Sequence, residues 1–411
     1  MKKIILATLL SFWFLFGFSQ NIDYAHKVLN KLGSEEFKGR GYVGNGDKIA
    51  AEFIKNQLDS LGTKSFKKDY FQNFSFPINT IPEKIFLSIN GKELIPGKDF
   101  LIDLHSGTTK GDFKIITFKV SEILKQKADN KDAFVAIIDD VNTKDSKAKI
   151  RSIIHTNYLN AAGYITIENN LIHEQSQEQY KFCIIKLKND LFSKPLKTIK
   201  IDVKNKFYKK YKTQNVIGYI KGEVDSFLVF TAHYDHLGKL GERATFYGAN
   251  DNGSGDAMVL NLADYYSHHK PHYTMVFMFF SGEEVGLLGS LYNASHPVFD
   301  LKKVKFLMNL DMVGTGQEGI RIVNSTVFKK EYDLLNKINT EKKYLVEIKK
   351  RGAAANSDHY PFYEKGVPSF FIYTLGGSKQ YHNIYDKPDQ LSLFAFKNLV
   401  SLLTDFVSDY R

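Results

Sequence analysis

Near-continuous apolar runs alternate with helical patterns through the second half of the chain, and this alternation constrains the fold most. Strands are predicted at residues 226–232, 273–280, 304–310, 320–323 and 367–373, and helices at 256–266, 286–294 and 393–410. Strands without polar alternation are typical of a sheet buried on both faces. The sequence therefore predicts an α/β fold in which helices flank a mixed, mostly parallel central sheet. The chemistry of such sheets gathers at the carboxyl ends of the strands.

The first half of the chain changes character at about residue 69. Residues 21–64 have helical periodicity, whereas 69–212 contain short β-like runs at 84–90, 113–118, 134–139 and 164–168, with one helix predicted at 147–162. We predict that 20–80 form the N-terminal part of the catalytic domain, 81–212 an inserted β-rich domain, and 213–411 the rest of the catalytic domain. The histidines of the inserted domain, His105, His155 and His173, are isolated from one another in the sequence, as structural histidines commonly are.

Residues 1–19 have the pattern of a secretory signal peptide. Lys2 and Lys3 precede an apolar run at 4–18, which is shorter than the roughly 20 residues of a membrane-spanning helix. We expect an exported protein, periplasmic or secreted, without stable membrane association after cleavage; an uncleaved anchor is the alternative. Cys183 is the only cysteine, so no intrachain disulfide can form.

The net charge of +11 raises the question of nucleic-acid binding. The excess lies in residues 1–213, with 35 Lys+Arg against 23 Asp+Glu, whereas the remainder has 21 against 22. The lysines are scattered and do not cluster with stacking aromatics. We therefore expect a solvated surface and no nucleic-acid partner.

Acidic and histidine side chains follow the predicted strands of the second half. They are His233 and Asp235, then Asp251 in a Gly-rich loop, Glu283 and Glu284, Asp311, and His382. Any one of these carboxylates, taken singly, is better explained by a helix cap or a loop hydrogen bond than by metal binding. Several anions packed at one sheet edge would repel each other, so the cluster needs a cation, and imidazole with carboxylate is a donor set suited to zinc.

Glu283 and Glu284 are neighbours that point to different sides, so one can bind metal while the other handles protons. Both also suit the start of a helix.

Other chemistries have weaker support. Ser254 and Ser281 do not lie in a G-x-S-x-G motif, and no P-loop or G-x-G-x-x-G motif is present. Arg40 lies in a Gly-rich loop, where structural hydrogen bonds are the commoner role and substrate contact the alternative.

Six motifs in fixed order resemble the co-catalytic di-zinc aminopeptidases, a family that also holds aminopeptidase Y, glutamate carboxypeptidase II and the glutaminyl cyclases. The motifs are Ala-His-Tyr-Asp-His-Leu-Gly at 232–238, Gly-Ala-Asn-Asp-Asn-Gly-Ser-Gly at 248–255, Ser-Gly-Glu-Glu-Val-Gly-Leu-Leu-Gly-Ser at 281–290, Asn-Leu-Asp-Met at 309–312, Ser-Asp-His at 357–359 and Tyr-His-Asn-Ile-Tyr-Asp at 381–386. The resemblance implies a zinc exopeptidase fold. The inserted segment loosely resembles a protease-associated domain.

The resemblance implies a role for each matching residue. Two zinc ions would be held, one by His233, Asp251 and Asp311 and the other by Asp251, Glu284 and His382, with Asp251 as the bridge. Glu283 would be the general base, Tyr381 would stabilise the oxyanion, and Asp235 would orient His233. Relatives have a cis peptide at the position of Asp251–Asn252, and we expect one here.

The predicted function is therefore a zinc-dependent aminopeptidase acting on peptide or protein N-termini. The alternatives are a glutaminyl-peptide cyclotransferase, which binds one zinc and does not keep the His233 site, and a non-catalytic receptor-like homologue. A dipeptidase or acid-specific carboxypeptidase would need arginines in its pocket. The second half has only Arg243, Arg321, Arg351 and Arg411, with Arg351 closest to a motif. The segments at 352–356 and 373–377 are predicted to form walls of the substrate pocket. Their small and apolar residues mildly favour uncharged substrates, and core packing explains them equally well.

Overall fold

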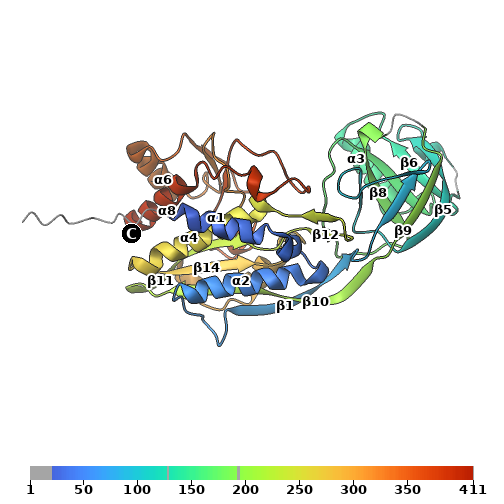
Figure 1. The fold of residues 1–411 in the computed structure, drawn as a ribbon. Helices are drawn as coiled ribbons and strands as arrows, with labels where there is room; N and C mark the ends of the chain where they lie inside the picture. Colours follow the sequence, from blue (N-terminus) through green and yellow to red (C-terminus); the bar gives the residue numbers. More distant parts are fainter. Residues whose placement is uncertain (1–20, 127–128, 192–194, 411) are drawn as a thin grey trace, which may run out of the picture.

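The computed structural model describes residues 21–126, 129–191 and 195–410 (Figure 1). The signal peptide predicted at 1–19 lies outside these residues. Among the described helices, none is long and apolar enough to cross a membrane. Figure 1 shows two lobes, each built around its own sheet and joined through the long strands β1 and β10.

The central sheet has eight strands. In spatial order they are β1 (Phe71–Thr80), β10 (Lys206–Ile220), β14 (Tyr273–Phe280), β11 (Val224–His233), β15 (Val304–Leu310), β18 (Ser369–Thr374), β16 (Ile320–Val323) and β17 (Ile348–Lys350). The four middle strands, β14, β11, β15 and β18, are parallel, whereas β10 and β16 pair antiparallel at the borders of this group. The prediction of a mixed α/β fold is confirmed.

Both faces of the central sheet are buried. In β11, Leu228, Phe230 and Ala232 belong to one apolar core, whereas Phe227 and Val229 belong to another on the opposite face. This alternation follows from the two-residue period of a strand, with helices covering both sides. The first face carries α1 (Ile22–Leu32), α2 (Gly46–Ser60), α4 (Ser254–His268), α6 (Lys329–Lys342) and α8 (Phe396–Asp409), and the second carries α5 (Leu288–Ser295) and α7 (His359–Glu364).

A second eight-stranded sheet forms the other lobe. In spatial order its strands are β3 (Lys92–Glu93), β2 (Phe86–Ile89), β9 (Thr198–Val203), β5 (Thr109–Lys119), β6 (Ala133–Ile138), β7 (Gly163–Glu168), β8 (Cys183–Lys188) and β4 (Phe100–Ile102). Helix α3 (Lys144–His155) packs on it. The predicted boundary at residue 212 falls inside β10, which belongs to the central sheet. The protease-associated character of this lobe stays a prediction.

Three of the eight elements predicted in the second half, β14, β15 and β16, have the bounds that the structure gives them, and the other five differ by one to three residues at their ends. The predicted helix at 147–162 was too long, since α3 ends at His155. Helices α6 and α7 were missed because α6 buries only four of its fourteen residues and α7 contains Pro361. A small hairpin of β12 (Gly238–Leu240) and β13 (Ala244–Phe246) follows β11.

Candidate metal centre

The carboxyl ends of the parallel strands bring the predicted site residues together. His233 is the last residue of β11, Asp311 directly follows β15, and Glu283 and Glu284 follow β14 after two residues. These strands are neighbours in one sheet, so their ends meet at one edge. Asp251, from the loop before α4, completes the cluster.

One group of ligand atoms surrounds His233. Its Nε2 lies 3.4 Å from Asp251 Oδ1 and 3.4 Å from Asp311 Oδ1, and 4.0 Å from Glu283 Oε2. Two atoms that each lie about 2.1 Å from one zinc, at a tetrahedral angle, are separated by about 3.4 Å. His233, Asp251 and Asp311 therefore have the spacing of a shared metal site.

A second group surrounds His382. Its Nε2 lies 3.2 Å from Asp251 Oδ2 and 3.1 Å from Glu284 Oε2. Asp251 thus directs one carboxylate oxygen to each group. This is the arrangement that a carboxylate bridging two cations requires.

The chain's own charges favour a bound cation here. Burial lowers the pKa of His382, but the Glu284 and Asp251 carboxylates outweigh it and raise the pKa to about 11. Burial raises the pKa of Glu284, but His382 and His236 lower it to about 2. Without a metal ion, the proton on His382 supplies positive charge that the buried anions need, and a bound metal ion would take the place of this proton. Asp311 Oδ1 is also buried without a hydrogen-bond partner in the described chain. A metal ion would satisfy all three groups.

The contacts of Asp235 differ from those expected of a residue whose carboxylate orients His233. The ring Nδ1 of His233 lies 3.1 Å from the backbone carbonyl of Asp235 and 3.8 Å from its carboxylate. The carboxylate instead accepts hydrogen bonds from the Glu283 N–H at 3.1 Å and the Tyr42 hydroxyl at 2.9 Å. The carboxylate therefore fixes the backbone of Glu283 more directly than it fixes the imidazole.

A chain of buried hydrogen bonds positions Asp311. Thr231 donates to Asn309, Asn309 donates to Ser357, and Ser357 donates to Asp311 Oδ2 at 2.7 Å. The bond from Ser357 occupies one carboxylate oxygen and leaves the other directed at His233. Ser357, the first residue of the motif at 357–359, thus orients Asp311.

His236 is a site residue that sequence reasoning missed. Its Nδ1 lies 2.6 Å from Glu284 Oε1, and His236, Asp251 and Glu284 form a second candidate metal-binding group. It lies in the same motif as His233 and Asp235, so its place in that motif was the available signal.

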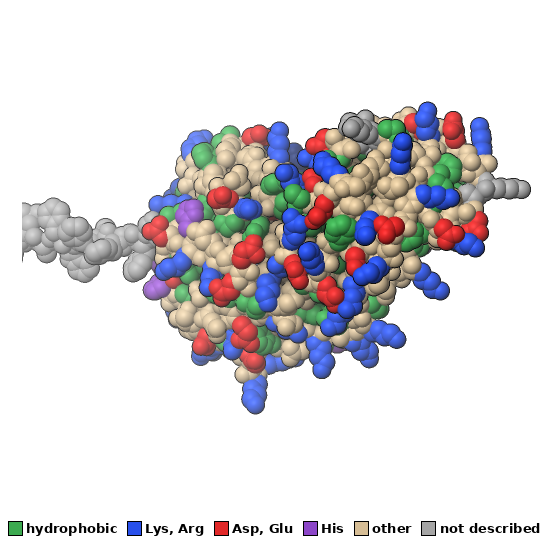
Figure 2. All heavy atoms as spheres, turned by 45° about the vertical axis from the view of Figure 1, so that its right-hand side comes forward, with side chains coloured by type: hydrophobic (Ala, Val, Ile, Leu, Met, Phe, Trp, Pro, Cys, Tyr) green, Lys and Arg blue, Asp and Glu red, His purple; other side chains and the backbone are tan. Residues whose placement is uncertain are grey.

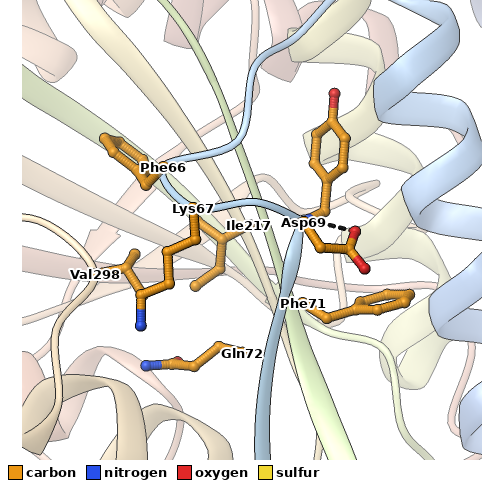
Figure 3. A pocket seen from close by; sticks show the side chains of 8 residues that line it. Phe66, Lys67, Asp69, Phe71, Gln72, Ile217 and Val298 are labelled. Carbon is orange, nitrogen blue, oxygen red and sulfur yellow. Dashed lines mark hydrogen bonds between the residues drawn. The ribbon is translucent and has the colours of Figure 1, made fainter.

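Figure 3 shows a small pocket lined by Phe66, Ile217 and Val298. Its volume is about 10 Å³, and none of the proposed metal ligands lines it.

Two buried groups hold the loop that carries Asp251. The Arg40 guanidinium donates to five backbone carbonyls, those of Leu32, Tyr234, Tyr247, Gly248 and Asp251. The prediction that Arg40 makes structural hydrogen bonds is confirmed. From the other side, the Asp386 carboxylate accepts from the N–H groups of Asn250 and Asp251. The Asp251–Asn252 peptide is cis, as expected.

A cavity of about 240 Å³ opens onto the ligands. Its lining comprises Asp251, Glu283, Asp311, Met312, Arg351, Asn356, Phe371, Tyr373, Tyr381 and His382. Tyr381 is 45% exposed, and its ring stacks on the imidazole of His382 with centroids 3.8 Å apart. Both predicted wall segments, at 352–356 and 373–377, contribute to the cavity.

Comparison with known proteins agrees with this fold. Residues 215–407 match the model of Peptidase family M28, and this segment of the chain belongs to that family. Aminopeptidase YwaD of Bacillus subtilis is 31% identical over 173 residues, 41% of this chain and 37% of that protein. A vacuolar membrane protease of Candida glabrata is 25% identical over 237 residues, 57% of this chain and 21% of that protein. The matched segments thus span well under half the length of these curated relatives.

The similarity of fold extends further than the similarity of sequence. The structure of BSAP, a zinc aminopeptidase from Bacillus subtilis, superposes with a TM-score of 0.71 at 21% identity and covers 94% of each chain. The second lobe is therefore part of the shared architecture.

Proposed function

We propose that this chain is an exported zinc-dependent aminopeptidase that hydrolyses the N-terminal peptide bond of peptides or proteins. The observation that carries the proposal is the placement of Asp251, whose two carboxylate oxygens face two separate ligand groups. Membership of 215–407 in Peptidase family M28 supports the same class of reaction.

Two ions fit the ligands present. His233, Asp251 and Asp311 would hold one zinc, and Asp251, Glu284 and His382 the other, with His236 in contact with Glu284. When bound, zinc supplies Lewis-acid polarisation and brings the pKa of water to about 7. The presence of His233 beside Asp311 favours two ions over the single zinc of a cyclotransferase.

Glu283 would act as the general base. Burial raises the pKa of Glu283 well above its usual range, although His233 opposes the shift. A carboxylate with a raised pKa takes a proton from water and holds it until the leaving amine accepts it. The Asp235 carboxylate, which binds the Glu283 N–H, keeps this side chain at the cavity wall.

Tyr381 would stabilise the oxyanion. Its side chain lines the cavity, and burial together with Asp251 raises the pKa of its hydroxyl, so that the hydroxyl keeps its proton. A protonated hydroxyl can donate a hydrogen bond to negative charge that develops on the scissile carbonyl oxygen. Export remains a proposal from residues 1–19, as does a protease-associated role for the second lobe.

A panel of aminoacyl p-nitroanilides and glutaminyl peptides tests the proposal, with zinc content measured by mass spectrometry. We expect about two zinc ions per chain, hydrolysis that chelation abolishes, and recovery on adding zinc. His233→Ala should retain one ion. Cyclisation of N-terminal glutamine without amide hydrolysis would overturn the aminopeptidase in favour of a cyclotransferase, and no turnover with zinc bound would favour the receptor-like alternative.

A further inference from the structure

Arg351 lines the same cavity as Glu283 and Asp311. It follows β17, and its backbone is fixed: its N–H donates to Ile322 O and Ser325 Oγ, and its carbonyl accepts from the Ser325 hydroxyl. The start of this side chain is therefore held at a defined point of the cavity wall.

The guanidinium of Arg351 is held on one side by Tyr373. One terminal nitrogen donates to the Tyr373 hydroxyl at 3.0 Å, and the guanidinium carbon lies 5.9 Å from the centroid of the Tyr373 ring. The tyrosine is neutral, so it orients the guanidinium without neutralising it.

Within the described chain, no carboxylate forms an ion pair with Arg351. Arg243, by contrast, pairs with Glu93 at 3.5 Å, and Arg40 uses its donors on backbone carbonyls. Arg151 and Arg321 also form no ion pair within the described chain, but neither lines this cavity. A guanidinium presents a planar fork of donors that matches a carboxylate. Arg351 thus offers an uncompensated carboxylate-binding group beside the metal ligands.

Apolar groups also contribute to the cavity wall. Met312, Phe371 and the ring of Tyr373 line the cavity together with Arg351. Such walls accept the hydrocarbon part of a side chain, and the guanidinium then meets a polar end. The combination fits a substrate group with an aliphatic stem and an anionic tip.

We propose that Arg351 binds a carboxylate of the substrate and thereby selects acidic substrates. The inference rests on the proposed peptidase function and deepens it. The carboxylate has two possible sources: the side chain of an N-terminal Glu or Asp, or the C-terminal carboxylate of a dipeptide. This differs from the expectation of uncharged substrates drawn from the small residues at 352–356.

Kinetics of the zinc-loaded protein separate these sources. kcat/KM is measured for Glu- and Leu-p-nitroanilide, and for the dipeptide Ala-Leu and its amide, with wild type, Arg351→Gln and the matched control Arg243→Gln. Loss of a charge-assisted contact should reduce kcat/KM about 10- to 100-fold. A loss confined to Glu-p-nitroanilide assigns the side chain, and one confined to Ala-Leu assigns the C-terminal carboxylate. Leu-p-nitroanilide should change less than about twofold in Arg243→Gln, and each loss in Arg351→Gln is expressed relative to the rate of the same variant on Leu-p-nitroanilide.

Binding provides a readout that does not need turnover. Calorimetry should give a Kd for L-glutamate that rises about 10-fold or more in Arg351→Gln, with the Kd for L-norvaline unchanged. Tyr373→Phe, which keeps the ring and removes the hydroxyl that orients Arg351, should show a smaller loss and guards against misfolding of the first variant. Equal behaviour of wild type and Arg351→Gln towards every carboxylate ligand would overturn the inference, and chelator-sensitive hydrolysis of Leu-p-nitroanilide would then leave the aminopeptidase proposal intact. Absence of all hydrolysis would instead count against the aminopeptidase.

Discussion

Two hydrogen bonds join the backbone of His173 to the backbone and the side chain of His382. The His173 N–H donates to the carbonyl of His382 at 2.9 Å, and the carbonyl of His173 lies 3.1 Å from Nδ1 of the His382 ring. A carbonyl can only accept, so Nδ1 carries a proton, and Nε2 is the nitrogen left to bind a metal ion held with Asp251 and Glu284. His173 lies between β7 and β8 of the second lobe, which therefore sets the tautomer of a proposed zinc ligand in the first.

The residues after His173 extend this contact. The side-chain amide of Gln175 donates to the Leu237 carbonyl at 2.8 Å, and that of Gln177 donates to the Val285 carbonyl at 3.0 Å. We call residues 173–177 the strap. It contacts the loops that carry His236 and Glu284 as well as His382, so it braces one side of the proposed second zinc site.

Loosening the strap should weaken zinc binding. The double variant Gln175→Ala and Gln177→Ala should bind the zinc proposed at Glu284 and His382 about 10-fold less tightly, because contacts that orient ligands commonly contribute this much. Competition with a chromophoric chelator measures the affinity. The control is Glu174→Gln, whose parent side chain is exposed and pairs with Lys186. Equal affinities in all three proteins would show that the strap does not support the metal.

Removing the hydroxyl of Ser357 should affect the other zinc. In Ser357→Ala, Asp311 Oδ2 loses its 2.7 Å hydrogen bond, and the carboxylate becomes free to rotate away from His233. We expect about a 10-fold loss of affinity for one ion only. The ion held through Glu284 and His382 serves as the internal control in the same titration. Loss of both ions together would contradict separate positioning of the two sites.

Glu283→Gln should separate chemistry from metal binding. Glutamine keeps the shape of the side chain but cannot take a proton from water, so kcat should fall about 10²- to 10⁴-fold. Zinc content and KM should change little, because Glu283 is not among the proposed ligands. Rates measured with an aminoacyl p-nitroanilide, beside zinc content from mass spectrometry, check both parts. Normal turnover in this variant would exclude Glu283 as the base.

Asp47 should make stability depend on pH. It is fully buried, and although Tyr211 and Thr213 donate hydrogen bonds to it, burial raises its pKa to about 6. The folded state thus binds this proton more tightly than the unfolded state, where the pKa is about 4. Stability should therefore fall by roughly 2 to 3 kcal/mol as pH rises from 4 to 7.

Urea unfolding at several pH values tests this dependence. Asp47→Asn should lack that part of the pH dependence, since its amide does not ionise in this range. Glu52→Gln, a substitution at an exposed residue of the same helix, should retain it. Parallel pH profiles for wild type and Asp47→Asn would contradict a raised pKa at Asp47.

Much of the fold was readable from local pattern. The runs that became β14, β15 and β16 were mostly apolar, so their bounds were visible without tertiary information. Because these strands lie in one largely parallel sheet, residues just past their ends had to approach one another. His233, Glu284 and Asp311 could be grouped for this reason.

The sequence by itself therefore determined the elements of the central sheet and the motif residues at its carboxyl edge. The tertiary structure decided which residues that are distant in the sequence contact them. His173 reaches His382 across 209 positions, and Arg40 reaches the carbonyl of Gly248 across 208. Arg351 lines the metal cavity only because β17 and β18 flank β16 in the sheet. Such contacts depend on how lobes and strands pack, which the periodicity of a short segment does not encode.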